Sequence, residues 1–158
     1  MSPKTIIIIE DDRWLSINPI KFWQENFDSL LSRISHKNIE VNLLLTNDDD
    51  IARLNNDFRG KDSPTNVLSF PQYEICNIDT ILTNDAIFIG DIAMSFDIIM
   101  RESIEFGITL QDRSFHLFVH GILHLLGENH ENDEQATKME QLEIEILNSV
   151  GIKNPYIL

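Results

Sequence analysis

Cysteine is nearly absent from the 158-residue sequence, because Cys76 stands alone and has no partner for an internal disulfide. Disulfide frameworks are typical of small secreted domains, whereas a lone cysteine fits a reducing compartment. Long hydrophobic runs are missing as well: the longest purely aliphatic run is Ile6–Ile9, and roughly 20 apolar residues are needed to cross a bilayer. No secretory leader opens the sequence. We therefore expect a cytoplasmic protein that has no contact with membranes.

Basic residues are also scarce, with 12 Lys and Arg against 26 Asp and Glu, giving a formal net charge of −14. This balance disfavours a broad phosphate-binding surface, because contacts to a nucleic-acid backbone need Lys and Arg. Net charge, however, does not describe the local field of a cleft. Arg53, Arg59 and Lys61 lie close together, while much of the acid lies in Asp48–Asp50 and Glu131–Glu145. A small basic site on an acidic body is therefore compatible with the composition.

The length of the chain and a hydrophobic content of 42% predict one domain with a sizeable core. Short β-branched or aliphatic runs predict strands, and apolar residues at helical spacing predict helices between and after them. The predicted strands are Thr5–Glu10 (a buried strand), Ile39–Thr46, Val67–Phe70 and Ala86–Ala93. The predicted helices open after Asn18-Pro19 and at Asn47 (with Ile51, Leu54 and Phe58 on one side), run over Ser95–Phe106 and over Leu110–Leu126 with Thr109 as its cap, and start again at Asn132 or Asp133. Gln72–Asp85 is predicted to be a long surface loop. The order indicates an α+β fold with about four strands in one mixed sheet and five or so helices. Parallel and antiparallel pairings are not separated by the sequence.

The most informative stretch runs from His120 to His130 and has the spacing H-x-x-x-H-x-x-G-x-x-H. On a helix, His120 and His124 lie on one face. Gly127 can adopt the left-handed conformation that ends a helix, so the chain can turn back and bring His130 towards the other two. A single histidine in an apolar helix is usually a packed core residue, but three in this spacing predict a tridentate zinc site with an open fourth position. An open position is typical of a catalytic metal.

The same spacing occurs in the metzincin peptidases, which have the pattern H-E-x-x-H-x-x-G-x-x-H. In that pattern a glutamate follows the first histidine and serves as the general base. This chain has Gly121 there. Glycine cannot accept a proton, so the sequence keeps the metal ligands and argues against peptide hydrolysis.

A second candidate is Arg59, which stands where a predicted helix gives way to the polar loop Arg59–Asn66. Its planar guanidinium suits bidentate contact with a phosphate. An arginine in a loop is more often part of the solvated surface, so the residue alone carries little weight.

Several stretches together resemble the YbeY family of bacterial zinc-dependent endoribonucleases, also called rRNA maturation factors. They are Leu54–Phe70 (LNNDFRGKDSPTNVLSF), Gly90-Asp91-Ile92, the triple-histidine stretch and Asn154-Pro155-Tyr156. The resemblance covers the chain from about the second predicted strand to its C-terminal helix. The histidine stretch and the Leu54–Phe70 stretch are specific in combination.

The resemblance implies that His120, His124 and His130 bind one zinc ion per chain and that Arg59 is a phosphate-binding residue essential for function. It implies a single metal-dependent endoribonuclease domain over residues 1–158, with the histidine cluster at the end of a central helix. The implied activity is cleavage of single-stranded RNA in the cytoplasm, in maturation of the 3′ end of small-subunit ribosomal RNA and in ribosome quality control. The implied partners are ribosomal RNA and the small ribosomal subunit with its proteins or an assembly GTPase.

The chain departs from the family pattern at two places. Asn66 stands where the family usually has aspartate, and Glu128-Asn129 stands where it has Tyr-Asp before the last histidine. Asn66 lacks the charge that a base needs, although asparagine still stabilises a turn.

The general base and the nucleophile are not identified by the sequence. His116, Asp91 and Glu128 are candidates for the base because they lie near the motifs, and either water or the ribose 2′-hydroxyl can attack. Two other interpretations stay open. The chain could be a non-catalytic, zinc-stabilised module that binds the ribosome or its RNA, or a metallopeptidase-like hydrolase, which Gly121 argues against.

Overall fold

The computed structural model describes residues 3–73 and 85–157, and its centre is a four-stranded mixed sheet in the order β1-β2-β4-β3. Strand β1 (Lys4–Ile9) pairs in parallel with β2 (Ile39–Thr46), β2 pairs in parallel with β4 (Ile87–Ser95), and β3 (Val67–Pro71) runs antiparallel to β4. The helices of the described residues are α1 (Arg13–Ile17), α2 (Ile20–Ile34), α3 (Asp48–Arg59), α4 (Phe96–Phe106), α5 (Leu110–Leu125) and α6 (Asp133–Ser149). The predicted α+β fold with a mixed sheet is confirmed.

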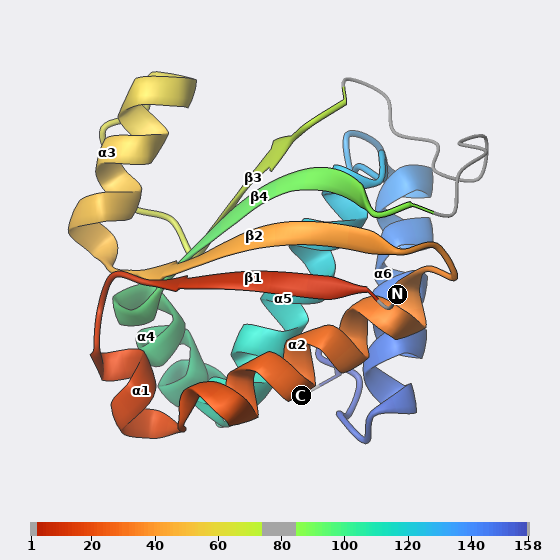
Figure 1. The fold of residues 1–158 in the computed structure, drawn as a ribbon, viewed down its shortest axis with the longest axis horizontal. Helices are drawn as coiled ribbons and strands as arrows, with labels where there is room; N and C mark the ends of the chain where they lie inside the picture. Colours follow the sequence, from red (N-terminus) through yellow and green to blue (C-terminus); the bar gives the residue numbers. More distant parts are fainter. Residues whose placement is uncertain (1–2, 74–84, 158) are drawn as a thin grey trace.

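The helices cover the two faces of the sheet unequally (Figure 1). Helices α2, α4 and α5 lie along one face, and the main core between them contains fully buried Trp14, Trp23 and Phe118. Helix α3 lies on the other face near one end of the sheet, where Ile51 packs on Leu68 and Ala93. Within residues 3–73 and 85–157, one face is therefore covered by several helices, while α3 alone packs on the other.

Side-chain caps fix where three helices begin. Asn47 accepts a hydrogen bond from the Asp50 amide, Thr109 from the Asp112 amide, and Asn132 from the Gln135 amide. Such caps stabilise a helix by about 1 kcal/mol relative to alanine. The predicted starts at Asn47, Thr109 and Asn132 are confirmed, and the cap at Thr109 fixes the register of α5.

Strand β1 corrects one prediction, because it is an edge strand and not a buried one. Its residues alternate: Thr5 is buried and Ile7 is half-buried, whereas Ile6 is 39% and Ile8 is 44% exposed. The reason is that side chains of a strand point to opposite faces, and helices cover one face here. The β-branched run predicted the strand correctly but carried no information about that uncovered face.

Other differences are local. The short helix α1 was not predicted, and Phe58 of α3 is 68% exposed although its spacing placed it on a packed stripe. The loop predicted over Gln72–Asp85, with Cys76, lies largely outside the described residues. Within residues 3–73 and 85–157, no helix has the length and apolar character needed to span a membrane.

Candidate metal centre and its surroundings

The end of α5 brings the three histidines of the motif together. Nε2 of His120 and Nε2 of His124 are 3.1 Å apart, and the ring of His130 lies 5.6 Å from the His120 ring and 5.0 Å from the His124 ring. The chain turns back at Gly127, which has φ +95. One ring nitrogen from each histidine lies within 4.8 Å of the other two. The predicted convergence of the three side chains is therefore present, and the cluster could hold a metal ion.

Hydrogen bonds at Nδ1 orient the two helical imidazoles. His120 Nδ1 lies 3.2 Å from a carboxylate oxygen of Glu143, and His124 Nδ1 lies 3.0 Å from the backbone carbonyl of Glu128. Both partners are acceptors, so each Nδ1 carries the proton, and in a neutral imidazole Nε2 is then a lone pair. Two lone pairs facing each other at 3.1 Å repel unless a cation lies between them. This orientation fits a metal ion bound at Nε2. Metal-binding histidines typically donate the N–H of their other ring nitrogen, here Nδ1, to a carboxylate or a backbone carbonyl.

The environment also favours neutral imidazoles. Burial lowers the pKa of His124, and the neighbouring His120 and His130 lower it further, because protonating one of three adjacent rings places its charge beside the others. A histidine binds a metal in its neutral form. The local electrostatics therefore support the donor state that a metal requires.

Glu143 is a site residue that the sequence did not identify. It lies on α6, is 1% exposed, and accepts hydrogen bonds from His116 Nε2 at 2.6 Å and the Tyr156 hydroxyl at 2.7 Å in addition to its contact with His120. Burial on its own raises the pKa of this carboxyl, but the hydrogen bonds from His116, His120 and Tyr156 lower the pKa to about 2. Glu143 is thus an ionised carboxylate in the protein interior. The sequence feature that could have identified it is its spacing: Glu143 follows Met139 by four residues and therefore lies on the buried face of the amphipathic helix α6.

The network continues from His116 away from the cluster. Arg113 Nη1 donates to His116 Nδ1 at 3.1 Å, which leaves the proton of His116 on Nε2, facing Glu143. Arg113 also pairs with Glu102 at 3.0 Å, and Glu102 accepts from the side-chain amide of Asn66 at 3.1 Å. Both nitrogens of His116 are therefore engaged in this network. The structure gives His116 an orienting contact with Glu143 and leaves it no free nitrogen to act as a base.

The contacts of Asn66 give a physical reason for its departure from the family pattern. Its side-chain amide nitrogen donates to Glu102, and its side-chain oxygen accepts from the Val67 amide at 2.7 Å. Aspartate at this position would place a second carboxylate against Glu102 with no proton to share. Asparagine is therefore suited to this position, because its amide donates a hydrogen bond to Glu102.

The other two candidates for a base have different contacts. The Glu128 carboxylate pairs with Lys138 at 3.2 Å, while its backbone carbonyl orients His124. Asp91 lies on the exposed side of β4 and accepts from the Asn42 side chain at 2.9 Å.

Arg59 is the last residue of α3, followed by Gly60 in the left-handed conformation with φ +67. The predicted transition from helix to turn is present there. The guanidinium is exposed and donates to the Ser69 carbonyl at 2.7 Å. Ser69 in turn donates through its hydroxyl to the carbonyl of Gly121, at 3.3 Å. Arg59 is thereby connected through β3 to the turn of α5 that lies between His120 and His124.

Around Arg59, the predicted basic group is smaller than the sequence suggested. Arg53 forms an ion pair with Asp50 on the same helix, one turn earlier. Within the described chain, the Ser69 carbonyl is the hydrogen-bond partner of the Arg59 guanidinium. The remaining N–H groups of Arg59 point to no other described acceptor, and five donors in a planar fork suit a phosphate.

Gly121 allows α5 to approach the sheet closely. A Cβ atom at this position would lie 3.0 Å from Ile92 Cδ1 and 3.1 Å from Ser69 Oγ. The position therefore faces β3 and β4, and any larger side chain would require Ile92 and Ser69 to shift. Glycine at this position suits the close packing of α5 on the sheet.

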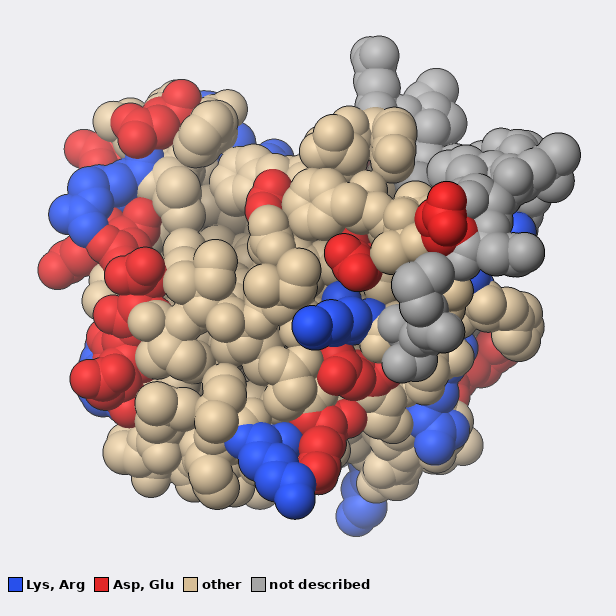
Figure 2. All heavy atoms as spheres, in the orientation of Figure 1, with Lys and Arg blue, Asp and Glu red and all other residues tan. Residues whose placement is uncertain are grey.

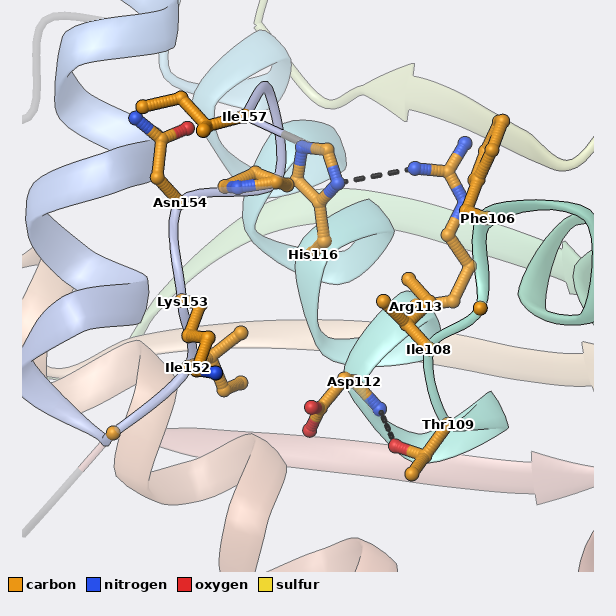
Figure 3. Close-up of a pocket in the computed structure, with 13 residues that line it drawn as sticks. Phe106, Ile108, Thr109, Asp112, Arg113, His116, Ile152, Lys153, Asn154 and Ile157 are labelled. Atoms are coloured by element: carbon orange, nitrogen blue, oxygen red, sulfur yellow. Dashed lines mark hydrogen bonds between the residues drawn. The ribbon is translucent and has the colours of Figure 1, made fainter.

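A separate cavity of about 680 Å³ lies beside His116 (Figure 3). The turn between α4 and α5 forms one side, with Phe106 and Arg113, and the C-terminal segment from Ile152 to Ile157 forms the other. The three clustered histidines do not line it. Arg113, one of the charged residues that line it, is paired with Glu102 and hydrogen-bonded to His116. The chemistry of the histidine cluster therefore lies outside this cavity.

Comparisons with known proteins agree with the geometry. A family profile described as "Endoribonuclease YbeY" matches residues 10–151. A curated protein named "Endoribonuclease YbeY" from Sphingopyxis alaskensis is 45% identical over 120 residues, which cover 75% of this chain and 71% of that protein. A protein of the same name from Francisella tularensis is 44% identical over 124 residues, covering 78% and 74% respectively. The solution structure of a Thermotoga maritima protein superposes with a TM-score of 0.57 at 25% identity, covering 92% of this chain and 91% of that one.

Proposed function

Because this chain belongs to the YbeY endoribonuclease family, we propose that it is a zinc-dependent, single-strand-specific endoribonuclease acting in late maturation of the 3′ end of small-subunit ribosomal RNA and in ribosome quality control. Family membership makes it an endoribonuclease, an enzyme that hydrolyses phosphodiester bonds of RNA. The observation that carries the zinc dependence is the pair of Nε2 lone pairs of His120 and His124 that face each other at 3.1 Å.

The proposed metal is zinc, held by His120, His124 and His130. Zinc–imidazole bonds are about 2.0–2.1 Å long, so two nitrogens on one tetrahedral zinc are about 3.3 Å apart. The 3.1 Å between Nε2 of His120 and Nε2 of His124 is close to that value. When bound, zinc supplies Lewis-acid chemistry, which polarises a phosphoryl oxygen and lowers the pKa of water to about 7.

The proposed role of Arg59 is to bind the scissile phosphate. Its N–H groups donate to the non-bridging oxygens and offset the negative charge that develops on these oxygens as the phosphorane forms. The hydrogen bond to the Ser69 carbonyl holds the guanidinium in place before the substrate arrives. Glu143 and the Glu128 carbonyl orient the histidines, so that the protein meets the substrate with its donors already arranged.

We propose further that residues 1–158 act as one domain in the cytoplasm, on ribosomal RNA presented by the small subunit, its proteins or an assembly GTPase. The charge distribution supports a partner. With Arg53 paired to Asp50, Arg59 and the exposed Lys61 remain of the three clustered basic residues to contact phosphates. Each phosphate contact to a single strand contributes only about −0.7 to the slope of log affinity against log salt concentration. Because few phosphates are contacted, we expect a low affinity for free RNA that depends only weakly on salt. A partner that presents the RNA supplies the missing specificity.

The activity and the metal are tested together with purified protein. We expect single-stranded RNA to be cleaved and casein to be left intact, and metal analysis to find about one zinc per chain. A chelator should abolish cleavage and added zinc should restore it, because the three imidazoles provide the metal site. Cleavage of casein would favour a peptidase. Binding of RNA with no cleavage in either condition would favour a non-catalytic module.

Glu143 provides a second test, independent of activity. Glu143→Gln keeps the size of the side chain but replaces one carboxylate oxygen with an NH₂ group. That group cannot accept the hydrogen bonds that His116 and His120 donate to Glu143 in the unmodified protein. Substitutions of residues that orient metal-binding histidines lower metal affinity about 10- to 100-fold. We expect such a loss when zinc affinity is measured by competition with a chromogenic chelator. Glu140→Gln, an exposed glutamate one turn earlier on α6, is the matched control and should bind zinc normally. Equal affinities would show that Glu143 does not position His120.

A further inference from the structure

The uncovered face of the sheet contains an apolar groove of about 410 Å³ beside α3. Its lining includes Ile8 of β1, Leu44 of β2, Leu54 and Phe58 of α3, and Phe70 of β3. Figure 2 shows a largely uncharged area over the strands, with carboxylates gathered along its α3 side. A sheet face normally packs on another layer. Among the described residues only α3 packs on this face, so its apolar groove offers a binding surface.

Two aromatic rings form one wall of the groove. The Phe58 and Phe70 centroids are 5.3 Å apart with the planes tilted by 60°, and Phe58 is 68% exposed. The guanidinium of Arg59 lies over the Phe70 ring, 5.6 Å from its centroid. An exposed aromatic ring next to an arginine is the combination that single-strand binding proteins use, since the ring stacks on a base and the cation contacts the adjoining phosphate.

The groove also has a polar element that suits a base and not a phosphate. Asp91 lies in it and accepts a hydrogen bond from Asn42, which fixes its carboxylate on the exposed side of β4. A carboxylate repels a phosphate but accepts hydrogen bonds from the exocyclic amino group of cytosine, adenine or guanine. Uracil offers no such amino group.

We infer that this groove binds one nucleobase of the RNA, stacked against Phe58 and hydrogen-bonded to Asp91, with Arg59 on the adjoining phosphate. The inference rests on the proposed function and adds a subsite to it. Arg59 connects the two, because it borders the groove through Phe70 and reaches helix α5 through Ser69 and Gly121. The base held in the groove therefore belongs to a nucleotide beside the scissile phosphate, and bases with an exocyclic amino group are preferred there.

The test measures binding without cleavage, using single-stranded DNA of about ten nucleotides and its abasic counterpart. Removing a stacking ring weakens binding by about 5- to 150-fold. We expect Phe58→Ala to show a loss in this range with the base-bearing strand and no loss with the abasic one, while Phe58→Tyr retains binding. Phe58 is largely exposed, so its replacement should leave the melting temperature nearly unchanged.

The matched control is Phe106→Ala, which removes another partly exposed phenylalanine, one that lies beside Arg113 and outside the groove. It should bind both strands as the unmodified protein does. Oligo-dC should bind more tightly than oligo-dU, and Asp91→Asn should remove that preference, because the amide can donate to the uracil O4.

Three results would overturn the inference: no binding of either strand, equal affinity for base-bearing and abasic strands, or equal losses in Phe58→Ala and Phe106→Ala. Each leaves the proposed function standing if RNA is still cleaved. Conversely, base-dependent binding through Phe58 in a protein that cleaves no RNA would retain the groove and contradict the proposed nuclease.

Discussion

His124→Ala is expected to lose most of its zinc and nearly all cleavage of single-stranded RNA. The substitution removes the nitrogen that faces His120 Nε2 at 3.1 Å, so two of the three converging donors remain. Changes that only disturb the orientation of a ligand cost about 10- to 100-fold in affinity or activity. Loss of a ligand should exceed the upper end of that range. Metal analysis and a cleavage assay on the same preparation measure both effects.

His36→Ala is the control for this result. His36 is exposed and lies outside the cluster, so its removal should change neither zinc content nor cleavage. His124 is partly exposed at the end of α5, and thermal unfolding of the metal-free proteins will show whether the fold is intact. A His124→Ala protein that keeps its full zinc content would mean that the metal binds elsewhere.

Short-range signals in the sequence predicted the elements that carry the candidate site. The cap at Thr109, the apolar spacing after it and Gly127 defined where α5 begins and where the chain turns back. The helix period then placed His120 and His124 on one face. These features depend on neighbours within one or two turns. For the same reason the histidine cluster, which comes from a single helix and the following turn, could be predicted.

Contacts between distant segments could not be predicted in this way. Glu143 reaches His120 from another helix, 23 positions along the chain, and Arg59 reaches α5 through Ser69. Such contacts depend on how helices pack on the sheet. The exposure of Ile6 and Ile8 likewise depends on which face the helices leave uncovered. Sequence periodicity specifies a face of an element but not what lies against that face.

Together, these long-range contacts form one hydrogen-bonded network from Asn66 to His120. It passes through Glu102, Arg113, His116 and Glu143, and each link joins a hydrogen-bond donor to an acceptor with no like charges facing each other. Buried polar networks are stabilising when every member is satisfied. The network therefore connects the strand that follows the Arg59 loop to the first histidine of the cluster. It gives the imidazole of His120 a fixed direction.

Arg59→Ala is expected to reduce RNA cleavage by about 10²- to 10³-fold, the typical cost of removing one donor that stabilises charge in a transition state. Zinc content and melting temperature should stay nearly unchanged, because Arg59 is exposed at the end of α3 and gives up one hydrogen bond, to the Ser69 carbonyl. Arg59→Lys keeps the charge without the planar fork, so it should recover only part of the activity.

The matched control for Arg59→Ala is Arg53→Ala, which removes an exposed arginine from the same helix. Arg53 is paired with Asp50 and lies outside the groove that Phe58 and Phe70 line. Both variants remove one positive charge from a protein of net charge −14, so a non-specific electrostatic effect would weaken cleavage equally in both. A local role predicts that Arg53→Ala cleaves RNA normally. If Arg59→Ala lost zinc or unfolded at lower temperature in parallel with its loss of cleavage, the contact with Ser69 would be structural, and the phosphate would have to be bound by another residue.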